Sequence, residues 1–211
     1  MTARAKSVEF PNASSRAEEI LLFWFAPDPG SDASTAQSRW FVANPEFDQL
    51  CRKRFLDMYE DAACGRLDDW RKEPRSCLAL ILLLDQFPRN MFRDTARAFA
   101  TDAKALELSR YAVGAAFDRR LPPLMRMFLY LPLEHSENMD DQLESVRLTH
   151  ALTAETPAMT ETLEYAEQHL ETIRLFGRFP ARNDALGRQS TQDEMNFLKT
   201  TSNRSCARDN D

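Results

Sequence analysis

The sequence is poor in glycine. Its 211 residues include five glycines against eleven prolines. Long series of β-hairpins need glycine in their tight turns, so this composition argues against an all-β fold and favours helices. Hydrophobic residues make up 43% of the chain, which is enough for a substantial core.

Long apolar segments are also absent. The runs Ile20–Phe25 and Leu78–Leu84 are too short to span a bilayer. The N-terminal segment carries positive charges but has no apolar signal-peptide core. We therefore expect a soluble protein without a membrane partner.

The cysteines and histidines do not form a recognisable metal motif. No Cys-x-x-Cys pair occurs among the four cysteines, Cys51, Cys64, Cys77 and Cys206. Such wide spacing predicts reduced thiols of a cytoplasmic protein rather than a disulfide framework or a thiolate site. Neither His135 nor His169 belongs to the Glu-x-x-His pair that helical dimetal bundles use twice. We expect no bound metal.

An excess of positive charge is missing as well. The net charge is −6 and the pI is about 5.2, which argues against a non-specific nucleic-acid binder. The sequence contains neither a glycine-rich phosphate loop nor a Gly-x-Ser-x-Gly nucleophile elbow. No cofactor is therefore expected, although a small basic pocket remains compatible with the composition.

Apolar residues recur at helical spacing along most of the chain, and no convincing β-alternation occurs. The pattern predicts an all-α fold of about eight helices with short antiparallel connections. The expected helices cover residues 14–25, 45–64, 76–87, 95–116, 122–137, 140–154, 159–176 and a short stretch from 191. We expect a single compact domain over 14–200, with a flexible N-terminal arm, 1–13, and a polar C-terminal tail, 201–211.

Two prolines are expected to limit helices. The run "CLALILLL" is apolar on all sides, so Ala79–Leu84 should lie in a central, buried helix that ends before Pro88. Pro132 should kink or break the helix over 122–137. In the helix over 95–116, the stripe that faces the core should include Phe99, Ala103, Leu106, Ser109 or Arg110, and Val113.

Two apolar segments end in the same polar signature. "LLLDQFPRN" occupies residues 82–90 and "LFGRFPARN" occupies residues 175–183, so Phe-Pro is followed each time by a basic residue and Asn. We define the first corner as residues 87–90 and the second corner as residues 179–183. We expect the two corners to face each other, each Phe filling the core and each Arg meeting inward carboxylates.

Two of the three histidines are expected on apolar helix faces. His135 shares a face with Phe128 and Leu131, and His169 shares one with Ile173. Each by itself is compatible with an ordinary core histidine. Asp85, however, falls near a helix C-terminus, where the helix dipole disfavours a negative charge, so a cation must compensate it.

The motifs resemble a known bacterial family. "ALILLLDQFPRNMFR", "AFATDAKAL", "RMFLYLPLEHSE", His169 and "FGRFPARND" occur in the order found in domain of unknown function 924, over roughly residues 17–198. The resemblance implies a tetratricopeptide-like array of helical hairpins, and it implies no activity, cofactor or substrate. Ala181 stands where many relatives are expected to carry His, which would weaken or alter a site there.

Three functions remain open at this point. The first is a module that binds a small anionic ligand or an acidic peptide group, with affinity rising as the pH falls from about 7.5 towards 6. The second is a hydrolase- or lyase-like enzyme with a His/Glu acid–base pair, and the third is a scaffold with a purely structural polar network. The candidate ligand-binding residues are Asp85, Arg89, Asn90, Glu134, His135, Glu137, His169, Arg178, Arg182 and Asn183.

Overall fold

The computed structural model describes residues 13–26, 40 and 43–208, and it describes side chains over 15–26, 40 and 43–200. Within these ranges the protein is all-α, with eight α-helices and no strand. The α-helices are α1 (Ala13–Phe25), α3 (Pro45–Ala63), α4 (Pro74–Met91), α5 (Asp102–Gly114), α6 (Pro123–Glu134), α7 (Met139–Glu155), α8 (Thr160–Phe176) and α9 (Gln192–Arg208). The 3-10 helices are η1 (Asp68–Lys72), η2 (Ala96–Phe99), η3 (Asp118–Arg120), η4 (Pro157–Met159) and η5 (Pro180–Arg182). The predicted all-α single domain of about eight helices is confirmed.

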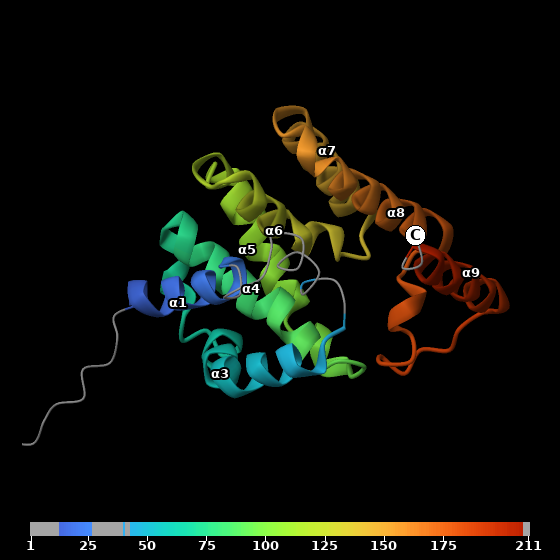
Figure 1. Ribbon diagram of the computed structural model, residues 1–211, viewed down its shortest axis with the longest axis horizontal. Helices are drawn as coiled ribbons and strands as arrows, with labels where there is room; N and C mark the ends of the chain where they lie inside the picture. Colours follow the sequence, from blue (N-terminus) through green and yellow to red (C-terminus); the bar gives the residue numbers. More distant parts are fainter. Residues whose placement is uncertain (1–12, 27–39, 41–42, 209–211) are drawn as a thin grey trace, which may run out of the picture.

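Helix α4 lies at the centre of the fold, as expected from its sequence. It packs against α1, α3, α5 and α6 (Figure 1). All side chains of Cys77–Leu84 are fully buried, because a helix that is apolar on all sides can be accommodated only where other elements surround it. The predicted burial of Ala79–Leu84 is confirmed.

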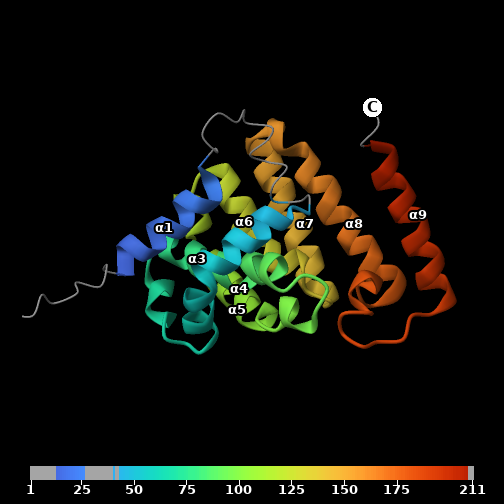
Figure 2. The same cartoon turned by 60° about the horizontal axis from the view of Figure 1, so that its bottom comes forward.

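Consecutive helices pack on one another from α3 to α8, while α9 contacts mainly η5. Figures 1 and 2 both place α9 at the edge of the molecule, beyond α8. None of the described helices is both long enough and apolar enough to cross a membrane. The C-terminal part of the fold is thus more loosely attached than the layers around α4.

Two helices, α3 and α9, begin at side-chain caps. Asn44 accepts hydrogen bonds from the backbone N–H groups of Glu46 and Phe47, both at 3.0 Å. Thr191 and Glu194 form a reciprocal capping box: the Thr191 N–H donates to Glu194 at 2.7 Å, and the Glu194 N–H donates to the Thr191 hydroxyl at 3.2 Å.

The prediction that α4 ends before Pro88 is wrong, since α4 continues to Met91. Proline cannot donate the backbone hydrogen bond that the carbonyl of Leu84 would normally accept. The Thr101 hydroxyl donates to this carbonyl instead, at 2.6 Å. A side chain from the next element therefore supplies the missing donor and allows the helix to pass its proline.

The single helix predicted over 95–116 is also wrong. The chain forms η2 and then α5, with a break around Thr101. The buried residues of α5 are Ala105, Leu108, Ser109 and Ala112, so Ser109 is the one member of the predicted stripe among them.

Helix boundaries near the C-terminus differ from expectation too. α6 passes Pro132 and ends at Glu134, and α9 extends to Arg208, into the segment 201–211 expected as a polar tail. α1 begins at Ala13, and the rest of the arm expected over 1–13 lies outside the described residues.

Candidate functional site

Six of the predicted site residues meet where α4, α6, α8 and η5 approach one another, and one of them is Arg89 of α4, which lies 3.3 Å from Asp85. We call this group the His centre. Asp85 comes from α4, Glu134 and His135 from the end of α6, His169 from α8 and Arg182 from η5. The chain brings them together because α4 stays helical past its proline and the second corner folds back onto α6.

His135 is anchored to a buried carboxylate. Its Nδ1 lies 2.8 Å from Oδ1 of Asp85, which is 0% exposed, and the other Asp85 oxygen accepts a hydrogen bond from Gln86 at 2.6 Å. A carboxylate partner makes Nδ1 the protonated nitrogen and leaves the Nε2 lone pair as the basic site. No described residue bonds to Nε2, and the His135 side chain is 15% exposed.

The surroundings of this pair keep Asp85 ionised and His135 neutral. Burial alone would raise the pKa of Asp85, but Arg89 and the hydrogen bonds from His135 and Gln86 hold this pKa below its usual value. Burial lowers the pKa of His135 to about 4, helped by Arg89 and opposed by Asp85. At neutral pH His135 is therefore a free base.

Glu134 has the opposite character. Its side chain is 9% exposed, and its Oε1 lies 3.2 Å from Nδ1 of His169. Burial and the negative Asp85 raise the pKa of Glu134 to about 8, so this carboxyl group is protonated at neutral pH. The His169 side chain is 35% exposed. Its Nδ1–H donates to the backbone carbonyl of Tyr165, one turn earlier in α8, at 2.8 Å. Burial also lowers the pKa of His169, and Arg182 adds to this effect.

The arginines of both corners lie against one carboxylate, that of Asp102. Arg89 binds both Asp102 oxygens at 3.0 Å, whereas Arg182 reaches one of them at 3.4 Å. The Arg182 guanidinium also donates to the His135 carbonyl at 2.9 Å and faces the rings of Phe99 and Phe179. Burial and the nearby Arg89 lower the pKa of Arg182 to about 10. The positive charge of Arg182 is thus less well compensated than that of Arg89.

Four of the predicted residues do not join the His centre. Asn90 donates to Asp48, Arg178 pairs with Glu194, and Asn183 donates to Ser190 and Glu194. Glu137 lies at the edge of the group, where it pairs with Arg188. Asn90 therefore fastens the first corner to α3, whereas Asn183 fastens the second corner to Ser190 and to Glu194 of α9, so the two asparagines do not form a shared shell.

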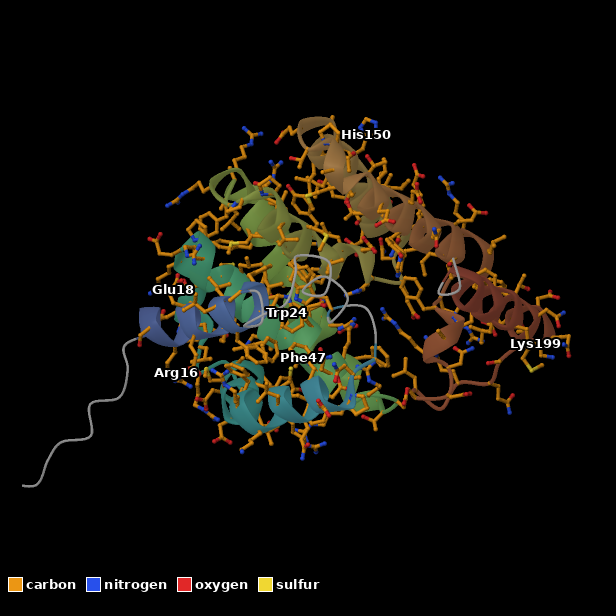
Figure 3. The ribbon with its side chains drawn as sticks, viewed as in Figure 1. Arg16, Glu18, Trp24, Phe47, His150 and Lys199 are labelled. Carbon is orange, nitrogen blue, oxygen red and sulfur yellow. The ribbon has the colours of Figure 1, made fainter. Side chains whose placement is uncertain are left out.

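Asp102, which both corner arginines contact, was not among the predicted site residues. Its only signal in the sequence is its place in the motif "AFATDAKAL", because a carboxylate in the first turn of a helix is common. The third histidine, His150, lies on the outer rim of the molecule (Figure 3). Among the described side chains, no group of three or more His, Cys, Asp or Glu could hold a metal.

A pocket of about 490 Å³ lies beside the His centre rather than at it. It is lined by η5, the loop that follows and α9, including Ala181, Arg188 and Met195. Ala181, where a histidine was expected in relatives, therefore faces this pocket. Arg188 connects the pocket to Glu137.

Comparison with known proteins agrees with the sequence motifs. The family model described as a bacterial protein of unknown function, DUF924, matches residues 20–202. The solved structure of the protein of unknown function ATU0120 from Agrobacterium tumefaciens is 34% identical with a TM-score of 0.79, and the match covers 90% of this chain and 99% of that chain. No curated protein matches. The chain therefore belongs to the bacterial DUF924 family.

Proposed function

We propose that the His centre is an acid–base site that binds a small anionic ligand and exchanges a proton with it. The observation that carries this proposal is the Asp85–His135 pair, which fixes Nδ1 at 2.8 Å and leaves Nε2 unpaired among the described residues. A buried carboxylate that orients an imidazole is the usual arrangement for a histidine acting as general base.

Glu134 supplies the matching acid. Between about pH 4 and pH 8, His135 lacks its second proton while Glu134 retains its proton. Two neighbouring groups with pKa values shifted in opposite directions are characteristic of acid–base pairs. His135 Nε2 would take a proton from the substrate or from water, and the Glu134 carboxyl group would return one to the leaving or accepting atom, as in a hydrolase or lyase.

Arg182 is the group best suited to hold the anionic part of the ligand. The Arg182 side chain is 14% exposed, and its guanidinium lies 3.4 Å from Asp102, farther than that of Arg89. Arg178, which was expected to help, is occupied by a two-point contact with Glu194. Since burial lowers the pKa of both histidines, protonation should strengthen anion binding at lower pH than the range of 7.5 to 6 expected from the sequence.

Sulfate is a suitable first probe because its own charge does not change near neutral pH. We expect sulfate to raise the melting temperature of the protein at pH 7, and Arg182→Ala to remove this gain. The affinity should fall as the pH rises through about 8, because ionised Glu134 repels the anion. Glu134→Gln should abolish this fall. Arg147→Ala, which breaks an exposed ion pair on α7, is the control.

A purely structural network is the alternative, and one observation favours it. Arg89, Arg178, Arg182 and Arg188 all contact a carboxylate. In that case Arg182→Ala and His135→Ala should lower the free energy of unfolding, by roughly 3–5 kcal/mol for a buried pair. A functional site should instead lose sulfate affinity with little loss of stability. Unfolding of both variants without any sulfate effect on the wild type would exclude binding.

Two further expectations belong to this proposal. The sequential packing of α3 to α8 supports a tetratricopeptide-like array, which suits a module that binds an acidic peptide group as well as a small molecule. Cys64 and Cys77 are unbridged thiols, in keeping with a cytoplasmic location. Native mass spectrometry of freshly purified protein would identify a retained ligand and so distinguish a small molecule from an acidic peptide.

A further inference from the structure

The segment 177–190, which links α8 to α9, borders one side of the His centre. The ring centroid of Phe179 lies 5.4 Å from that of His169, and Arg182 donates to the His135 carbonyl. Phe179 is buried although it lies in a loop near the edge of the molecule. The position of this segment therefore determines what surrounds both histidines.

One carboxylate fastens both ends of this segment. Glu137 Oε1 accepts the Phe179 N–H at 2.8 Å. Arg188 binds the two Glu137 oxygens at 2.9 and 3.0 Å and also donates to the Phe179 carbonyl at 3.0 Å. Glu137 thus joins the beginning and the end of the loop that presents Arg182.

The backbone of the segment reverses direction at two glycines. Gly177 and Gly187 have φ values of +66° and +65°, in the left-handed region that glycine adopts most easily. Between them, Arg182 contributes the polar contacts to Asp102 and to the His135 carbonyl. A segment attached at few points should move when the contact that joins its ends is lost.

We propose that Glu137 is a positioning residue of the His centre, which holds segment 177–190 so that Arg182 and Phe179 lie against His135 and His169. The choice of site rests on the function proposed above, but the proposal concerns the ligand-free protein. Glu137, expected from the sequence to bind a ligand, would act here through Arg182.

The histidines themselves report where Arg182 lies. After burial, the positive Arg182 and Arg89 lower the pKa of His169, and the Tyr165 carbonyl opposes them. Glu134 faces the same ring. After burial, Arg89 and Arg182 likewise lower the pKa of His135, and Asp85 opposes them. If Arg182 and Phe179 move away, the histidines lose a positive neighbour and gain water, and both effects raise their pKa values.

The test is a pH titration of the histidine ring signals by NMR in ligand-free protein. We expect Glu137→Ala and Arg182→Ala each to raise the pKa of His169. The rise caused by Glu137→Ala should be smaller in a protein that already carries Arg182→Ala than in the wild type. Glu144→Ala is the matched control, because it removes an acidic partner of arginine on α7 outside the His centre. The exposed His150 provides an internal reference signal.

An unchanged His169 titration in Glu137→Ala, alongside a raised one in Arg182→Ala, would overturn the proposal. A purely structural Glu137 would lower stability without moving either titration. If Glu137→Ala does not fold, Glu137→Gln and Arg188→Ala replace it, since the glutamine retains an acceptor for Phe179 while both variants break the ion pair. Absence of sulfate binding would disprove the proposed function and leave this result unaffected.

Discussion

The two corners carry the same four kinds of residue but occupy different environments. The first corner lies inside α4, where Pro88 is an interior helix residue, whereas Pro180 is the first residue of the short helix η5. Both nevertheless place an arginine on the carboxylate of Asp102. The shared signature therefore gives both corners an arginine contact with Asp102, although their backbone conformations differ.

The phenylalanines show what this difference means for packing. Phe87 is fully buried among aromatic rings, with centroid distances of 5.0 Å to Trp24 and 5.1 Å to Phe55. Phe179 contacts the polar His169 and Arg182 instead. The first corner thus belongs to the core, and the second belongs to the site.

The largest predicted effect separates the corners by stability. Phe87→Ala should lower the free energy of unfolding by about 3–5 kcal/mol, because it leaves a cavity in a close-packed aromatic cluster. Phe179→Ala should cost about 1–2 kcal/mol, since its segment can adjust at the edge of the fold. Urea denaturation measures both. Equal losses would show that the second corner is as much part of the core as the first.

The next prediction tests what the corners share. Asp102→Ala should cost about 2 kcal/mol, because it removes charged hydrogen bonds from two arginines in a partly exposed place. A double-mutant cycle with Arg182→Ala should be non-additive, since both changes break one contact. The exposed Glu144–Arg147 pair should show a coupling of only about 0.3–0.5 kcal/mol. Additive losses would mean that Asp102 does not join the corners.

Two titratable groups beside the corners, Glu134 and His135, should respond oppositely to pH. Folded Glu134 keeps its proton up to about pH 8, whereas the unfolded chain releases it near 4.5, so this contribution to stability is lost as the pH rises through about 8. The lowered pKa of His135 removes stability only as the pH falls below 6.5. Between pH 6.5 and 8 the wild type should therefore lose about 1–2 kcal/mol. Glu134→Gln should show no such loss. Urea denaturation of both proteins at pH 6.5 and at pH 8 measures the free energies of unfolding that decide this.

The smallest effect concerns the two prolines. Thr101→Val should cost about 1 kcal/mol, because it removes the hydroxyl donor from the Leu84 carbonyl that Pro88 leaves unpaired. Thr95→Val is the matched control, since the exposed Thr95 makes a similar bond to the Phe92 carbonyl. Pro180, at the start of η5, needs no such donor. Equal losses in the two variants would show that Pro88 is accommodated in another way.

Much of the fold could be predicted from sequence because helical periodicity and capping are local. Asn44, Thr191 and Glu194 satisfy backbone groups within three residues, and the all-apolar α4 could only be buried. The end of α4 could not be predicted in this way, since the hydroxyl that bonds to the Leu84 carbonyl belongs to Thr101, 17 residues beyond Leu84. The phase of α5 was misjudged because one break at Thr101 rotates every later residue.

The sequence by itself determined that Asp85, His135 and the two corner arginines would be polar groups among apolar neighbours, since side-chain type and helical spacing are written in it. Only the tertiary structure decided which carboxylate each arginine binds, because contacts such as Arg182 with Asp102 join residues 80 positions apart. It also decided the protonation of Glu134 and His135. Their pKa values depend on burial and on charges from other helices, which no local pattern contains.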